Sequence, residues 1–288
     1  MRQSYPKQLL DINEIMKKGI VYFLILILFT FCNNGDNKQL SLSDPQIENP
    51  APNDEYFQEI AAEIGLDFIH SIGAGEMENI IESVGGGAAF LDFDQDGFMD
   101  IYTCSGTWVK GFSKTKPPES DNYNRLYRNL KNGTFQEVSK TAGVRGPWYS
   151  MGVTVGDVNK DGYPDIWLSS YGDNTLYVNI GGGTFVEVTG QSGGGGGKDC
   201  CVGGVWWDFD NEGLLDLYVG NYLNYDPDYS YYYAPDGFPG PLAYDSQKDV
   251  LYKNVGDNKF EDVTEQICII DVDGRAMGVG AADYDGDG

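Results

Sequence analysis

One short acidic segment, repeated along the chain, constrains the fold more than any other feature of the sequence. Its first copy spans residues 92–100 and has aspartates at positions 1, 3, 5 and 9, with Gly97 at position 6. Carboxylates this close in sequence can converge only if the loop wraps around a positive charge, and glycine supplies the left-handed backbone that such wrapping needs. The expected centre is a hard cation with oxygen ligands, Ca²⁺.

The same pattern recurs, with further copies beginning at Asp157, Asp208 and Asp283. The last copy reaches only position 6, at Gly288. Chance would give on the order of 0.01 complete copies in such a chain, so the recurrence is a specific signal. Side-chain oxygens at positions 1, 3, 5 and 9 and the backbone carbonyl oxygen at position 7 are the predicted ligands. The predicted metal ligands are Asp92, Asp94, Asp96, Phe98, Asp100, Asp157, Asn159, Asp161, Tyr163, Asp165, Asp208, Asp210, Glu212, Leu214, Asp216, Asp283, Asp285 and Asp287.

An EF-hand is the obvious competing interpretation, because its loop also begins with this spacing of carboxylates. That site requires a bidentate glutamate at position 12 and a helix on either side. Here position 12 is occupied by Thr103, Leu168 and Val219, and the flanking segments are strand-like. The sequence therefore excludes an EF-hand.

A longer repeat surrounds each loop. A glycine-rich apolar segment precedes the loop, and a short apolar strand follows each complete copy. Two further strands carry the patterns LYxN and GTFxEV, the latter written NKFEDV in the third copy. Loop starts are separated by 65, 51 and 75 residues, and the excess over the shortest interval fits in connecting loops. Four antiparallel strands per unit predict an all-β fold, a β-propeller built from four-stranded blades.

These segments resemble FG-GAP or VCBS repeats of the integrin-α type, and more closely the cartilage-acidic-protein-like family that usually ends in an ASPIC/UnbV domain. The resemblance covers residues 56–288 and is carried by residues 57–70, GGGAAFLDFDQDGFMDIY, VGDVNKDGYPDIW, the LYxN and GTFxEV strands, and YAPDGFPG at 233–240. It implies a propeller whose acidic loops bind Ca²⁺ within individual blades, usually in exported or cell-surface proteins. Tyr233 stands where relatives tend to have a cysteine, and the ASPIC/UnbV region is absent.

About three and a half blades are present where that family builds about seven. Together with the fourth loop, which lacks its position 9, this leads us to expect a fragment of a seven-bladed ring that forms an open arc. Such an arc would expose a strand edge, which is an aggregation liability.

The N-terminal region predicts export. Residues 19–31 form an uncharged run behind Lys17 and Lys18, of the length expected for a signal sequence and too short for a comfortable membrane span. Translation is expected to start at Met16, which makes residues 1–32 upstream sequence plus signal peptide. Cys32 follows the run, where a bacterial lipoprotein carries its lipidated cysteine; Phe31 departs from that pattern, so ordinary cleavage or an uncleaved anchor stays open. Residues 33–55 are polar and predict a flexible tether, and residues 56–288 the partial propeller.

The formal charge of −25 argues against a nucleic-acid partner, since phosphate binding rests on lysine and arginine. We expect an exported calcium-binding module for adhesion or for recognition of a protein or glycan at the cell surface. It would belong to the bacterial cell envelope, as an outer-membrane lipoprotein, or to the extracellular space. Membrane contact is expected only through the N-terminal lipid or signal anchor.

The alternative is a carbohydrate-active enzyme, a propeller lyase or hydrolase with catalytic residues partly outside this sequence. His70 is the single histidine and one general-base candidate, but the chain has no nucleophile elbow, zinc spacing or phosphate-binding glycine motif. The tyrosine-rich stretch 222–244 predicts either a binding loop or an insert packed on its own blade.

The cysteines beyond Cys32 are even in number, so disulfides are permitted but their pairing is open. The adjacent Cys200 and Cys201 either form a strained bridge or point to opposite faces of a strand. The cysteines concerned are Cys104, Cys200, Cys201 and Cys268.

Overall fold

A computed structural model describes residues 57–111, 122–146, 148–194, 200–229, 237–269 and 273–285. The chain divides into two compact units, Met1–Gln58 and Glu59–Gly288, and the fold described below is that of the second. The predicted start at Met16, signal region 1–32, Cys32 and tether 33–55 lie outside the described residues. Among the residues described, no helix has the length and apolar character needed to cross a bilayer.

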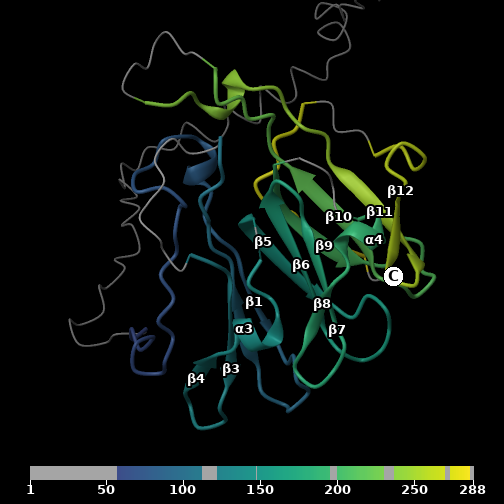
Figure 1. Cartoon of the computed structure of the whole chain (residues 1–288). Coiled ribbons are helices and arrows are strands. Elements are labelled where there is room, and N and C mark those ends of the chain that lie inside the picture. The colour runs from purple at the N-terminus through teal and green to yellow at the C-terminus, as the bar shows by residue number, and fades with distance from the viewer. Residues whose placement is uncertain are drawn as a thin grey trace, which may run out of the picture. The chain divides into compact units, whose positions relative to one another are not determined.

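Three four-stranded antiparallel sheets follow one another along the chain, as the repeat predicts (Figure 1). In each sheet the strands pair in chain order, so each sheet is a meander whose first hairpin carries an acidic loop. The first sheet contains β1 (Ala88–Leu91), β2 (Asp100–Thr103), β3 (Arg125–Asn129) and β4 (Phe135–Glu137); the second β5 (Tyr149–Gly156), β6 (Asp165–Tyr171), β7 (Thr175–Asn179) and β8 (Phe185–Glu187); the third β9 (Cys201–Trp207), β10 (Asp216–Asn221), β11 (Val250–Gly256) and β12 (Lys259–Asp262).

The three acidic loops close their hairpins in the same register. The aspartate at position 9 pairs with the residue that directly precedes position 1, as in the pairs Leu91 with Asp100 and Gly156 with Asp165. The third hairpin repeats this arrangement. Because a slip by one residue would turn every side chain to the other face of the sheet, the common register places equivalent residues of each repeat in equivalent surroundings.

Short helices that the sequence analysis did not predict follow two of the fourth strands, namely α3 (Ser139–Ala142) and α4 (Thr189–Ser192). Their first residues accept a hydrogen bond from the start of the third strand: Leu126 N donates to Ser139 Oγ at 2.7 Å and Leu176 N to Thr189 Oγ1 at 2.9 Å. Two single-turn 3₁₀ helices, η1 (Ile81–Ser83) and η2 (Pro241–Ala243), lie in connections.

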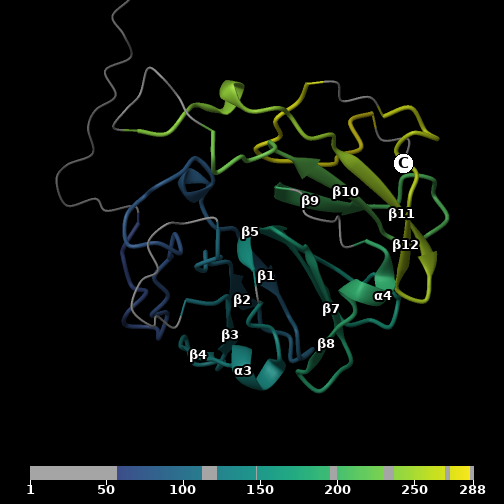
Figure 2. The ribbon, with the colours of Figure 1, turned by 45° about the horizontal axis from the view of Figure 1, so that its top comes forward.

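Neighbouring sheets lie next to one another (Figure 2), and clusters of buried side chains join them. One cluster combines Tyr102 and Leu126 of the first sheet with Ile166 and Leu168 of the second. Another joins the second and third sheets. Its members are Val158, Trp167, Leu176, Val178, Cys201, Leu217, Val219, Tyr252 and Phe260. At about 1.5–3 kcal/mol for each large apolar side chain fully buried, these clusters are the main attraction between sheets.

The expected first strand of a fourth unit, residues 277–282, is not a strand in the part of the chain that the structure describes. Strands are defined by the ladder they form, and the partner in that hairpin would begin at position 9 of the fourth loop, beyond Gly288. The structure shows three four-stranded sheets, and the count of three and a half blades is not confirmed. The seven-bladed ring stays a prediction.

The expectation that Cys200 and Cys201 face opposite sides is confirmed. Cys200 belongs to a cluster with Tyr149, and Cys201 to the cluster with Trp167. No disulfide joins the cysteines of the described residues, and Cys268 is the exposed one.

The described part of the tyrosine-rich stretch packs on its own fold. Tyr222 and Tyr244 are buried beside Ile81, and Tyr225 and Tyr229 stack against Tyr244 with ring centroids 5.8 and 5.4 Å apart. This favours the packed insert over the binding loop for these residues. Residues 230–236 lie outside the described part.

Candidate metal centres

The three complete acidic loops have the same internal hydrogen bonds. At position 1, Asp92 accepts the Asp96 N–H on Oδ1 at 3.0 Å and the Gly97 N–H on Oδ2 at 2.8 Å. Asp157 and Asp208 accept the equivalent pair of N–H groups in their own loops. The first carboxylate therefore folds each loop back on itself, which brings positions 3 and 5 near position 1.

Two residues of each loop have left-handed backbone conformations. Position 6 is glycine, as predicted, and its φ is 88° in Gly97, with 90° and 89° in the other two loops. Position 4 has φ near 60° although it is never glycine: Gln95 (56°), Lys160 (60°) and Asn211 (61°). Non-glycine residues in this region cost about 1–3 kcal/mol each. The left-handed conformation at position 4 was not predicted; its only sequence signal is a polar residue before the DG or EG step.

The aspartate at position 9 is fully buried and ties its hairpin to the third strand. Asp165 accepts the Val158 N–H at 2.9 Å and the Asn179 N–H at 2.8 Å, one on each oxygen. Asp100 and Asp216 make the same two bonds in their repeats.

Burial raises the pKa values of these aspartates. The pKa of Asp100 rises to about 6 and that of Asp165 to about 7, and that of Asp216 is also raised; the other carboxylates of each loop add to the effect. Ionising position 9 therefore becomes easier when a cation offsets the negative charge of the loop.

Carboxylate oxygens converge in two of the three loops. Asp92, Asp94 and Asp96 bring one oxygen each within 4.8 Å of one another. In the third loop the same holds for Asp208, Asp210 and Asp216, without Glu212. In the second loop, three carboxylate oxygens do not lie within this distance of one another, although the backbone has the same shape.

The first loop also contains an unsatisfied buried oxygen. Asp94 Oδ1 is shielded from solvent and has no hydrogen-bond donor among the described residues. Since buried carboxylate oxygens are normally paired, this atom and the converging donor set fit a hard cation.

Basic side chains on the third strand, or just after it, partly neutralise two of the loops. Arg128 Nη2 lies 2.5 Å from Asp94 Oδ2, and Lys131 Nζ lies 3.2 Å from Asp96 Oδ2. Lys253 pairs with Asp210 and, at 3.1 Å, with Glu212.

These pairs shift the pKa values of the groups involved. Hydrogen bonds to Asp210 and Glu212 raise the pKa of Lys253. Partial burial acts to raise the pKa of Asp96, but the hydrogen bond from Lys131 holds it below the usual value.

Among the described residues, no such cation pairs with the second loop. The position of Arg128 and Lys253 in the LYxN pattern is occupied by Val178, which is buried. The variable residue of that pattern was the sequence signal for these cations, and the sequence analysis did not use it. The loops thus differ in built-in charge although their backbones match.

The loops also contact one another through position 4. Gln95 Nε2 donates to the Gly162 carbonyl of the second loop at 2.5 Å. Lys160 reaches the third loop, where a Cβ atom on Gly213 would lie 2.7 Å from Lys160 Nζ.

The asparagine of LYxN bonds to the loop of the preceding repeat. Asn179 Nδ2 donates to Phe93 O, and Asn254 Nδ2 to Val158 O, both at 2.8 Å. These bonds place the three loops side by side, as links between successive sheets.

The remaining predicted ligands are placed as follows. Phe98 and Tyr163, at position 7, have their N–H groups bonded to the position-5 aspartate of their own loops, and Leu214 is half-buried. Asp283 and Asp285 are exposed and line a cavity of about 740 Å³ together with Asp208 and Asp210. Asp287 lies outside the described residues.

Comparison with known proteins agrees with the repeat. Residues 92–168 and 158–219 match the family described as FG-GAP-like repeat. No curated protein matches the sequence significantly.

Among solved structures, the chain is similar to a lectin of Agrocybe aegerita from work on its specific recognition of non-reducing terminal N-acetylglucosamine. The two are 17% identical, with 60% of this chain and 36% of the lectin chain covered and a TM-score of 0.32. The chain thus spans about a third of that lectin, and the likeness is too distant to bear on function. Together, the sequence and the sheets establish an all-β chain in which residues 92–219 match FG-GAP-like repeats.

Proposed function

We propose that the chain is an exported calcium-binding repeat module that recognises a protein or glycan at the cell surface, with Ca²⁺ as a structural ion inside its hairpins. The observation that supports it best is the threefold recurrence of one loop geometry, with converging carboxylates in the first and third copies. The buried, unpaired Asp94 Oδ1 adds a specific point of fit.

Calcium suits these loops better than other common ions. The donors are carboxylate, amide and carbonyl oxygens on a flexible loop, which Ca²⁺ accepts, whereas Mg²⁺ dehydrates reluctantly and prefers a rigid octahedron. In each loop the residues that would hold the ion are the side chains at positions 1, 3, 5 and 9 and the carbonyl at position 7. When bound, the ion supplies positive charge that offsets repulsion between the carboxylates.

A structural role follows from what the loops connect. Position 9 joins the hairpin to the third strand, and position 4 and the LYxN asparagine join neighbouring repeats. Ordering a loop would therefore stiffen the contact between two sheets. Extracellular modules commonly bind calcium at about 10⁻⁴–10⁻³ M, concentrations reached outside the cytoplasm.

The location and the finer family assignment are part of the same proposal. The apolar run and Cys32 support the bacterial envelope, as an outer-membrane lipoprotein, or secretion. The sequence resemblance supports the cartilage-acidic-protein-like branch and a seven-bladed ring. The geometry supports an enzyme less well than a binding module. His70, the general-base candidate, contacts a backbone carbonyl, with Nδ1 3.4 Å from Cys104 O.

The test is a calorimetric Ca²⁺ titration of the full chain, with thermal melts in calcium and in chelator. We expect about three sites and a melt that rises with calcium, each site adding ~2.7 kcal/mol at a hundredfold excess over Kd. Asp92→Asn/Asp94→Asn removes one site. The control Asp226→Asn/Asp228→Asn removes two carboxylates from a turn outside the loops and leaves all sites intact. A folded protein that binds no calcium would overturn the proposal.

A further inference from the structure

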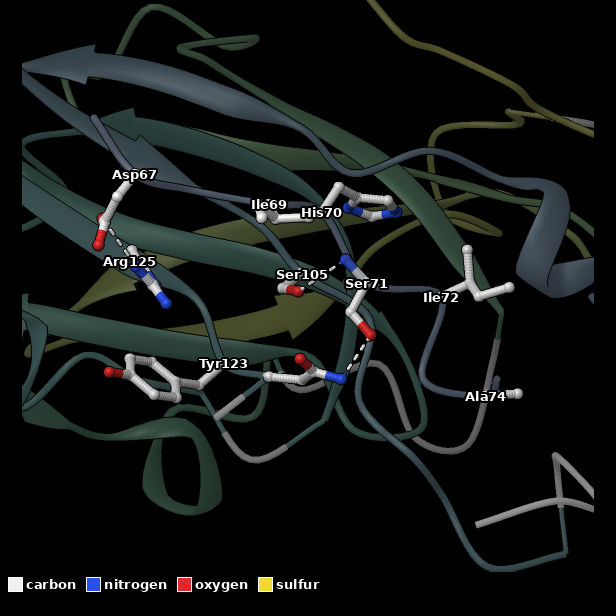
Figure 3. A pocket seen from close by; sticks show the side chains of 10 residues that line it. Asp67, Ile69, His70, Ser71, Ile72, Ala74, Ser105, Tyr123 and Arg125 are labelled. Atoms are coloured by element: carbon white, nitrogen blue, oxygen red, sulfur yellow. Dashed lines mark hydrogen bonds and ion pairs between the residues drawn. The ribbon is translucent and has the colours of Figure 1, made fainter. Parts of the chain in front are cut away.

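A cavity of about 490 Å³ lies beside the first sheet, where segment 67–74 meets the connection between β2 and β3 (Figure 3). Ser105 follows the last residue of β2, and Arg125 is the first residue of β3. The acidic loop precedes β2, at Asp100, so the cavity is at the opposite end of this strand. It is therefore separate from the candidate metal centre of the same sheet.

The charged residues that line the cavity are Arg125 and Asp67. Arg125 Nη1 donates to Asp67 Oδ1 at 2.8 Å and to the Tyr127 hydroxyl at 3.3 Å, and Tyr127 also donates to Asp67. These bonds fix one edge of the Arg125 guanidinium. The Arg125 side chain is only 20% exposed. Its Nε and Nη2 have no recorded acceptor among the described residues, and Figure 3 shows the group directed towards Tyr123. The free edge can bind a planar oxyanion through two parallel hydrogen bonds.

A second guanidinium lies behind this charged lining. Arg145 Cζ is 3.8 Å from the centroid of the Tyr123 ring, and its Nη2 donates to the Tyr123 hydroxyl at 2.9 Å. Arg125 lies 5.5 Å from that ring. Among the described residues, two arginines beside one aspartate make this corner locally positive in a chain of net charge −25. The cavity is thus suited to a negatively charged group.

The other polar groups of the cavity are already ordered. Asn122 Nδ2 donates to Ser71 Oγ at 2.6 Å, and Ser71 N donates to Ser105 Oγ at 3.3 Å. Because these groups are fixed by one another, binding costs little side-chain entropy. Asn122 Oδ1 and His70 Nε2 have no recorded partner among the described residues, so they can bond to hydroxyl groups. Apolar wall is supplied by Ile69, Ile72 and Ala74.

We propose that this cavity binds a hexuronate, the carboxylate-bearing sugar unit of acidic polysaccharides. The Arg125 edge pairs with the carboxylate, while Asn122 and His70 bond to ring hydroxyls. A cavity of this volume is at the lower end of small-ligand sites and is larger than a lone carboxylate requires. This inference deepens the proposed recognition role by naming its ligand class, and it does not depend on calcium.

The test is ligand-observed NMR titration of the full chain with D-glucuronate, in calcium and in chelator. D-glucose serves as the probe without a carboxylate and acetate as the probe without a ring. We expect a Kd for glucuronate on the order of 1 mM, from the usual affinity per ligand atom. Glucose and acetate are each expected to bind at least about tenfold more weakly than glucuronate. If the protein binds glucuronate but no calcium, this inference stands while the metal proposal is refuted.

Variants locate the site. Arg125→Met weakens glucuronate binding about tenfold or more, because a charge-assisted pair is lost. Asn122→Ala weakens it less and leaves the arginine in place. The control Lys140→Met removes an exposed positive charge from α3 and leaves the affinity unchanged. Unchanged affinity in a folded Arg125→Met protein, equal affinity for glucose, or equal affinity for acetate would each overturn the inference.

Discussion

The substitution Asn179→Ala tests whether the LYxN asparagine holds neighbouring sheets together. Asn179 is fully buried, and its side chain makes three hydrogen bonds. Nδ2 donates to Phe93 O of the preceding repeat at 2.8 Å and to Pro164 O at 3.3 Å, and Oδ1 accepts the Gly181 N–H at 3.0 Å. Alanine removes all three bonds and leaves the backbone of β7 intact.

The expected loss of stability is about 3 kcal/mol. The Phe93 carbonyl bond is buried, and an unsatisfied buried acceptor costs about 1–3 kcal/mol. The other two bonds lie nearer solvent and contribute about 0.5–1.5 kcal/mol each, with part regained from water. For a folded unit of this size the loss corresponds to a fall in melting temperature of roughly 6–12 °C.

The chain offers a matched control at the same position of the first repeat. Asn129 Nδ2 donates to Met99 O of its own loop at 3.1 Å, and its Oδ1 accepts the Lys131 N–H, both in exposed surroundings. Asn129→Ala should cost only about 1 kcal/mol. Urea denaturation followed by tryptophan fluorescence gives both values. Equal losses in the two variants would refute the role of the inter-sheet bond, whereas Asn254→Ala should behave like Asn179→Ala.

Further predictions concern charge and thiols. In chelator, stability should fall as pH rises from about 4 to about 7, because burial raises the pKa of Asp165 to about 7 and the folded protein keeps a proton that the unfolded chain has lost. Urea titrations at several pH values measure this slope, which Asp165→Asn should reduce; a flat profile would contradict it. Lys253→Met should tighten calcium binding at the third loop about fivefold by calorimetry, since a competing cation is lost, whereas exposed Lys259→Met should change little. An unchanged affinity would argue against competition. Alkylation mapped by mass spectrometry should modify Cys268 in the native protein and the buried cysteines only after unfolding; early modification of a buried thiol would count against the packing. The buried thiols are Cys104, Cys200 and Cys201.

Much of the fold could be predicted because its signals are local. The spacing of carboxylates and glycine in residues 92–100 sets the loop, and the apolar residues on either side set the strands that it joins. The left-handed Gly97 was predicted for the same reason, since few other residues adopt that backbone cheaply. The opposite orientation of Cys200 and Cys201 follows from the two-residue period of a strand.

The parts that sequence reasoning missed depend on packing between distant segments. The LYxN pattern shows Val178 at the position of Arg128, but only the fold shows that Arg128 reaches Asp94 of its loop. The left-handed φ of Lys160 has no marker as strong as a glycine. The helices α3 and α4 are too short to show a periodicity.

The sequence by itself determined the repeat, the four-stranded unit and the candidate metal ligands, because each depends on residues close together along the chain. Tertiary structure decided which loops carry built-in cations, which asparagine joins two sheets, and that Asp67 and Asn122 line one cavity beside Arg125. Those outcomes depend on which surfaces meet when the sheets pack. The repeat pattern shows which units are alike, whereas the contacts of each unit are seen only in the packed fold.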